Sequence, residues 1–191
     1  MFYSILLAGG LSSRMGEDKA YLEFDGQSLL QAGLNLLKDI DSELILLSGR
    51  SGYPESVPDI LEQCGPPGGL YACLQYLLKI DKLDDSPLLI LPVDMPRLKP
   101  EILETLLANI SEQQGCHFAG EIFPCVLRAS EKLRAYLEQI FDESHELGGK
   151  RSMRAVLDFC KSKQVLKDSL KSEFFKNINT PEDYEKLLLA E

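Results

Sequence analysis

Short apolar runs alternate along this chain with longer stretches in which apolar residues recur at helical spacing. The runs that predict strands are Ser4–Leu7, Leu44–Leu47, Leu88–Leu91, Phe123–Leu127 and, more weakly, Glu173–Ile178. A strand that is apolar on both sides has to be buried on both faces, as parallel strands are when helices cover the sheet. The alternation therefore predicts an α/β fold of three layers, in which a mainly parallel central sheet lies between helices.

Each helical stretch gathers its apolar residues on one face. These residues are Leu29, Leu30, Gly33, Leu34, Leu37 and Ile40; Leu70, Leu74, Leu77 and Leu78; Leu103, Leu106, Leu107 and Ile110; Leu133, Leu137, Ile140 and Phe141; and Met153, Val156, Leu157 and Cys160. A last helix is indicated by Thr180 as N-cap, Pro181 at the first helical position and Asp183 as the acid of a capping box. No repeat, low-complexity tract or linker divides the 191 residues, so we expect a single domain, residues 1–191.

Composition excludes several classes of protein. The formal net charge of −10 argues against a general nucleic-acid binder, which gains its affinity from a basic face that neutralises phosphates. The N-terminus has neither a basic leader nor an apolar stretch of the about 20 residues that a membrane span needs, so we expect a cytoplasmic protein without a membrane partner. The five cysteines form no C-x-x-C pair, and their odd number is not typical of a disulfide framework.

A glycine-rich loop comes directly after the first expected strand. It contains Gly9, Gly10 and Gly16 together with the basic residues Arg14 and Lys19. Glycines let a ligand approach the backbone closely, and amides in such turns point at negative charge, so the loop predicts an anion cradle. It is not a Walker A loop, because no Gly-Lys-Ser/Thr follows, and it is not a dinucleotide fingerprint, because Gly9 and Gly10 are adjacent.

Two further motifs are expected at the same edge of the sheet. Asp94 follows the strand Leu88–Leu91, and Gly65–Gly69 opens a helix whose first amides can also meet an anion. In parallel sheets, ligands bind outside the carboxyl ends of the strands, near the point where the strand order reverses. The sequence therefore predicts one ligand site, formed by the glycine loop, Asp94 and the start of that helix.

Residues 7–19 resemble the signature loop L-A-G-G-x-S-x-R-M-G-x-D-K of sugar-phosphate and cofactor nucleotidyltransferases. Three more segments, Gly65–Leu70, Leu91–Pro96 and Asn177–Asp183, resemble the molybdenum cofactor guanylyltransferases in order and spacing. The resemblance implies a Rossmann-like nucleotidyltransferase fold. It also implies an enzyme that transfers GMP from GTP to the phosphate of molybdenum-molybdopterin, with Mg²⁺ as cofactor and pyrophosphate as the second product.

The resemblance assigns catalytic work to three side chains. Lys19 stabilises charge at the α-phosphate as pyrophosphate departs, and Arg14 grips the β- and γ-phosphates. Asp94 is the metal-binding aspartate, in keeping with the preference of Mg²⁺ for oxygen ligands. Each has a plainer alternative: Lys19 as a surface lysine, Arg14 as an ion-pair partner of Glu17 or Asp18, and Asp94 as the N-cap of a turn.

Nucleotide recognition is assigned mainly to main-chain groups. By resemblance, the backbone of Leu7, Ala8, Gly9 and Gly10 reads the guanine, and an aspartate near the place of Asp59 contacts the guanosine nucleotide. Asp59 could equally be a turn residue after a proline.

Three other segments carry open assignments. Family members often have an asparagine where this chain has Leu47–Arg50, so no side-chain contact is carried over there, and Arg50 either serves the cleft or is a solvated surface charge. Asn177 and Asn179 either orient a metal ligand or the second substrate, or satisfy loop backbone. The glycine-led basic segment Gly148–Arg154 is predicted to hold the pterin phosphate.

Two other functions remain open from sequence. A cytidylyltransferase acting on the same pterin or a related phosphate would share the glycine loop and the strand-end aspartate. A non-catalytic nucleotide-binding regulator would share the fold, although it would not need Lys19 as a leaving-group stabiliser. The guanylyltransferase interpretation also implies cofactor-delivery proteins or molybdoenzymes as partners.

Overall fold

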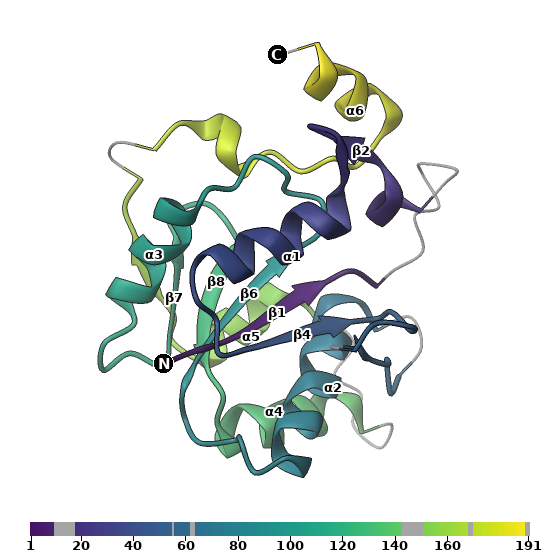
Figure 1. The fold of residues 1–191 in the computed structure, drawn as a ribbon. Coiled ribbons are helices and arrows are strands. Elements are labelled where there is room, and N and C mark those ends of the chain that lie inside the picture. The colour runs from purple at the N-terminus through teal and green to yellow at the C-terminus, as the bar shows by residue number, and fades with distance from the viewer. Residues whose placement is uncertain (10–17, 55, 62–63, 143–150, 168–169, 190–191) are drawn as a thin grey trace.

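The fold, a computed structural model, is described for residues 1–9, 18–54, 56–61, 64–142, 151–167 and 170–189 (Figure 1). Its centre is a seven-stranded sheet in the order β5-β4-β1-β6-β8-β7-β9. The strands are β1 (Tyr3–Leu7), β4 (Leu44–Ser48), β5 (Ser56–Val57), β6 (Pro87–Pro92), β7 (Gly115–Phe118), β8 (Cys125–Arg128) and β9 (Lys163–Val165). β8 runs antiparallel to both of its neighbours, and every other pair in the sheet is parallel. The mainly parallel sheet is as predicted.

Helices cover both faces of this sheet (Figure 1). They are α1 (Leu29–Asp39), α2 (Gly65–Lys79), α3 (Pro100–Asn109), α4 (Glu131–Phe141), α5 (Met153–Phe159) and α6 (Pro181–Leu188), with short 3-10 turns η1 (Lys19–Tyr21) and η2 (Ser172–Phe175) and a small hairpin of β2 (Glu23–Phe24) and β3 (Gln27–Ser28). Alternate residues of β1 face opposite layers: Ile5 packs with α2, α4 and α5, whereas Leu6 packs with α1 and α3. The predicted three layers are thereby confirmed.

The prediction of a strand at Glu173–Ile178 is wrong. Its first residues form η2, and Ile178 lies in a loop, where its N–H donates to the Asp94 carbonyl at 2.9 Å. The apolar residues of this segment are buried by loop packing instead of sheet pairing: Phe175 makes an edge-on contact with Phe118, and Ile178 is 2% exposed. Apolar content alone therefore does not distinguish a strand from a buried loop here.

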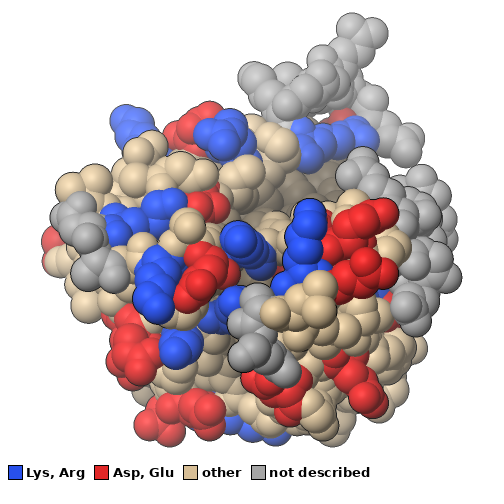
Figure 2. Space-filling view, turned by 90° about the horizontal axis from the view of Figure 1, so that it is seen from above, with Lys and Arg blue, Asp and Glu red and all other residues tan. Residues whose placement is uncertain are grey.

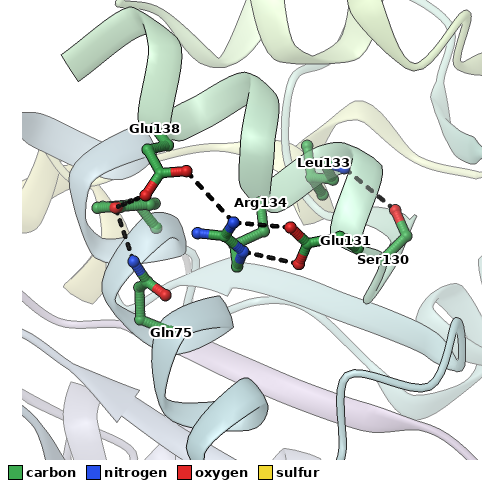
Figure 3. A network of polar contacts seen from close by, with 7 residues as sticks. Gln75, Ser130, Glu131, Leu133, Arg134 and Glu138 are labelled. Carbon is green, nitrogen blue, oxygen red and sulfur yellow. Dashed lines mark hydrogen bonds and ion pairs between the residues drawn. The ribbon is translucent and has the colours of Figure 1, made fainter. Parts of the chain in front are cut away.

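Specific polar contacts fix the start of α6 and link α2 to α4. α6 begins with the predicted capping box, in which the Thr180 hydroxyl accepts from the Asp183 N–H and the Asp183 carboxylate accepts from the Thr180 N–H. A polar network links α2 to α4 (Figure 3): the Tyr71 hydroxyl of α2 donates to Glu138 of α4 at 3.5 Å, and within α4 Arg134 forms ion pairs with Glu131 and Glu138. None of the described helices is both long and apolar enough to span a membrane.

Candidate functional site

The carboxyl ends of three neighbouring strands meet at one place. β1 lies between β4 and β6, with Leu7 opposite Ser48 on one side and Pro92 on the other. Past the last ladder positions, the Val93 N–H donates to the Leu7 carbonyl at 3.0 Å, and the Ala8 N–H donates to the Ser48 carbonyl at 3.1 Å. The loops that leave these strands are therefore held side by side, as expected for a ligand site at the point where the strand order reverses.

A cavity of about 210 Å³ opens between these loops. It is lined by Leu7, Ala8, Gly9, Asp18, Lys19, Ala20, Arg50, Pro66, Pro92, Val93 and Asp94. The structure thus brings together Leu7, Ala8, Gly9, Lys19 and Asp94, whereas Gly10 and Arg14 lie outside the described residues. The face seen from above has a recess bordered by Lys and Arg side chains, with Asp and Glu side chains close by (Figure 2).

Lys19 joins two segments that are far apart in the sequence. Its Nζ lies 3.4 Å from Asp94 Oδ2, just after β6, and donates a hydrogen bond of 2.9 Å to Asn179 Oδ1, just before α6. The side chains of Lys19 and Asp94 are each only 17% exposed. An ammonium that is held from two sides and largely removed from water acts more strongly on nearby charge than one in solvent. Asn179 therefore orients Lys19, whereas the sequence had suggested a metal ligand, the second substrate or loop backbone as its partner.

The Asp94 carboxylate is asymmetric in its partners. Oδ2 faces Lys19, whereas Oδ1 is buried and has no hydrogen-bond partner among the described residues. Burial raises the pKa of Asp94 above its usual value, and the Lys19 charge opposes that rise. A buried carboxylate oxygen without a donor fits a hard divalent cation, and Mg²⁺ is commonly held by one or two carboxylates together with substrate phosphates.

Asp59 also reaches this edge of the sheet. Its Oδ2 lies beside both Gly9 and Gly49, since a Cβ on either glycine would come within 3.3 Å of it. Burial of its carboxyl group raises the pKa of Asp59 above its usual value. The structure therefore places the predicted nucleotide-contacting aspartate next to the glycine loop, which the distance along the sequence could not establish.

Arg50 is not a solvated surface charge. Its side chain is 16% exposed, its Nε donates to the Ala8 carbonyl at 2.7 Å, and its Nη1 and Nη2 bind both carboxylate oxygens of Asp18. Hydrogen bonds from Arg50 lower the pKa of Asp18, so this carboxyl group stays ionised. The sequence signal for this role was Gly49-Arg50 directly after a buried strand. That pattern alone does not identify Asp18 as the partner of Arg50.

Two sequence expectations for anion binding find less support. Of the first residues of α2, Pro66 and Pro67 have no N–H, and the Gly68 N–H donates to the Cys64 carbonyl at 3.4 Å, so this helix start offers few amides to an anion. In the basic segment, Gly148 to Lys150 lie outside the described residues. Arg151 is not among the residues that line the cavity, and its Nε donates to the Ile140 carbonyl at 3.1 Å.

The fold of this chain is shared with solved structures of other proteins. The chain matches the structure of the Molybdopterin-guanine dinucleotide biosynthesis protein A from Archaeoglobus fulgidus with a TM-score of 0.73 and 21% identity, over 97% of this chain and 96% of that one. It matches 4-diphosphocytidyl-2C-methyl-D-erythritol synthase from Anaerococcus prevotii with a TM-score of 0.69 and 12% identity, over 100% of this chain and 95% of that one. At these identities, both matches establish the fold alone.

The family follows from sequence. Residues 4–165 match the family described as the MobA-like NTP transferase domain. The chain is also 31% identical over 184 residues to the molybdenum cofactor guanylyltransferase of Xanthomonas euvesicatoria pv. vesicatoria, over 96% of this chain and 93% of the relative. The chain belongs to the MobA-like NTP transferase family, and the resemblance expected from its motifs is confirmed.

Proposed function

We propose that this protein transfers GMP from GTP to the terminal phosphate of molybdenum-molybdopterin, giving the molybdopterin guanine dinucleotide cofactor and pyrophosphate. The observation that carries the proposal is the Lys19–Asp94 pair inside a cavity at the carboxyl ends of β1 and β6. The activity named for the Xanthomonas relative, at 31% identity over nearly the full length of both chains, supplies the substrate class.

The chemistry needs no covalent intermediate with the protein. A phosphate oxygen of the pterin attacks the α-phosphorus of GTP, a new P–O bond forms, and the bond to the β-phosphate oxygen breaks as pyrophosphate leaves. Lys19 lies ready to stabilise the negative charge that grows in this step, and Asn179 holds its Nζ in place. Positioning and charge stabilisation are the main contributions that phosphoryl-transfer enzymes make.

A divalent metal is common in nucleotidyltransferases. We assign Mg²⁺ to Asp94, and its unpartnered Oδ1 supports that assignment. When bound, Mg²⁺ neutralises phosphate charge and polarises the reacting phosphoryl group. We also propose that Arg14 binds the β- and γ-phosphates and that Gly10 is part of the nucleotide cradle, because both residues belong to the glycine-loop motif of residues 7–19.

Guanine selection falls to the backbone of Leu7, Ala8 and Gly9, with Asp59 beside them. Guanine presents N–H donors at N1 and N2, which need an acceptor, whereas adenine has an acceptor at N1. Among the described residues, Val93 donates to the Leu7 carbonyl and Arg50 to the Ala8 carbonyl, and a carbonyl oxygen has two lone pairs. Each therefore keeps one acceptor position for a base edge.

Calorimetric titration with GTP, CTP and ATP in the presence of Mg²⁺ tests this function. An unpaired buried hydrogen-bonding group costs about 1–3 kcal/mol, so GTP is expected to bind at least about tenfold more tightly than the other two. A preference for CTP, or equal affinity for it, would favour the cytidylyltransferase, whose fold this chain shares. GTP binding without release of pyrophosphate in the presence of the pterin substrate would favour a regulator.

The proposal has three further parts. Free GTP and the pterin are both small soluble substrates, so we place the reaction in the cytoplasm. The product has to reach molybdoenzymes, so delivery proteins or those enzymes are the expected partners. Residues 1–191 act as one domain, a proposal supported by the pairing of strands from both ends of the chain in one sheet, and a single cooperative unfolding transition would test it.

A further inference from the structure

The loop after β4 is pressed against the glycine loop by a contact between two glycines. A Cβ on Gly49 would lie 2.3 Å from the Gly9 Cα, and Gly49 has a φ of +76°, so this position requires glycine on both counts. The Gly49 N–H also donates to the Val57 carbonyl at 3.2 Å, which fixes the loop from its other side. Arg50, the next residue, is consequently delivered directly beside the Ala8 carbonyl.

Arg50 uses all three of its nitrogen atoms in this place. Nε donates to Ala8, and the two terminal nitrogens bind the two oxygens of Asp18 in the parallel geometry that makes an arginine–carboxylate pair specific. Asp18 Oδ1 in turn accepts from the Ala20 N–H at 3.1 Å and so caps η1, the turn whose first residue is Lys19. The guanidinium group therefore bridges Ala8, at the end of β1, and the η1 turn that carries Lys19.

We propose that Arg50 is a positioning residue, which holds the Lys19 turn beside Ala8, at the end of β1, through the Asp18 carboxylate. The inference rests on the proposed function and deepens it, because it explains how the Lys19 side chain is positioned before the nucleotide binds. Lys19 is restrained at its Nζ by Asp94 and Asn179. Arg50 restrains it from the backbone side, so both ends of the side chain are fixed, as preorganised charge stabilisation requires.

The contacts distinguish this role from direct phosphate binding. A guanidinium whose two terminal nitrogens both bind the Asp18 carboxylate, and whose side chain is 16% exposed, offers a triphosphate little net charge. A lysine at position 50 would keep the charge but lose the planar fork that bridges Ala8 and Asp18. Substitution by lysine therefore separates geometry from charge.

The experiment compares Arg50→Lys with Arg134→Lys. Arg134 is a suitable control because it also forms a two-pronged pair, with Glu131, and its side chain is 13% exposed, yet it lies on α4 and does not line the cavity. Arg50→Lys is expected to lower kcat by roughly 10- to 100-fold, the effect of displacing a reacting group by about 1 Å, with the KM for GTP changed less than about threefold. Arg134→Lys is expected to leave both constants at the wild-type value.

A second readout does not depend on the substrate. Hydrogen exchange of the free protein is expected to be faster at the Ala20 amide in Arg50→Lys than in the wild type, and unchanged there in Arg134→Lys, because Asp18 loses its anchor only in the first variant. Wild-type exchange at Ala20 together with wild-type kcat in Arg50→Lys would overturn the inference. A raised KM with intact kcat would overturn it too, and would make Arg50 a nucleotide ligand. If exchange at Ala20 changes as expected but neither the wild type nor the variants turn over GTP, the positioning role of Arg50 is supported and the proposed function is refuted.

Discussion

Replacing Gly49 by alanine tests how closely the two loops have to approach. The new Cβ would lie 2.3 Å from the Gly9 Cα and 2.8 Å from the Gly9 nitrogen, whereas ordinary contact begins at 3.4 Å, so the loops have to separate by about 1 Å. A displacement of that size at a reacting centre costs about 100-fold in rate. Positive φ adds about 1–2 kcal/mol of backbone strain to the folded state.

Gly52→Ala is the matched control for this change. Gly52 lies in the same loop with a φ of +84°, but a Cβ there would have no neighbour within 4 Å, so alanine brings the strain without the clash. Steady-state pyrophosphate release is expected to fall about 100-fold in kcat/KM for Gly49→Ala and less than about threefold for Gly52→Ala. Urea unfolding of both variants measures the strain. Equal kcat/KM in the two variants would refute the argument that the Gly9–Gly49 contact positions the site.

Two further predictions concern single side chains. Lys19→Ala is expected to lower kcat by at least about 100-fold while the Kd for GTP changes far less, because its charge matters most as pyrophosphate departs; unchanged kcat would remove the assigned role. Burial, with a smaller contribution from the Arg154 charge, lowers the pKa of His117 below 6.5, and so the unfolded chain binds more protons just below that pH. The free energy of unfolding is therefore expected to decrease as the pH falls below 6.5, and urea titrations at pH 7.5 and 5.5 should show a smaller decrease in His117→Gln.

The sequence predicted the layers of this fold well but missed its edge. The strands β1, β4 and β6 are continuous apolar runs because helices cover both of their faces, so their composition identifies them. β9 lies at the edge of the sheet, with Lys163 and Gln164 exposed, and β7 contains Gly115 and His117. Neither has the apolar content that predicts a strand, because their pairing depends on neighbours supplied by the tertiary structure.

The candidate site, too, was only partly predictable from the sequence. Motif spacing predicted that Lys19 and Asp94 would converge, because both follow parallel strands whose carboxyl ends meet at one edge. It could not predict that Arg50 binds Asp18, because that pair depends on the φ of Gly49 and on the approach of two glycine backbones. Arg14, with the plainer alternative of an ion pair with Glu17 or Asp18, lies outside the described residues.

Charge balance in the cavity predicts that Asp94 is important for GTP binding. The described charged residues that line it are Asp18, Lys19, Arg50 and Asp94, two of each sign, so they offer a triphosphate no net positive charge. On the proposed assignments, the remaining attraction comes from Arg14, backbone amides and a divalent cation at Asp94 Oδ1. Asp94→Asn, which keeps the shape but removes the charge, is therefore expected to abolish the gain in GTP affinity that Mg²⁺ gives the wild type. It is also expected to lower turnover by more than about 100-fold. Calorimetry with and without Mg²⁺, with circular dichroism to check the fold, measures this; a full Mg²⁺-dependent gain in the variant would place the metal elsewhere.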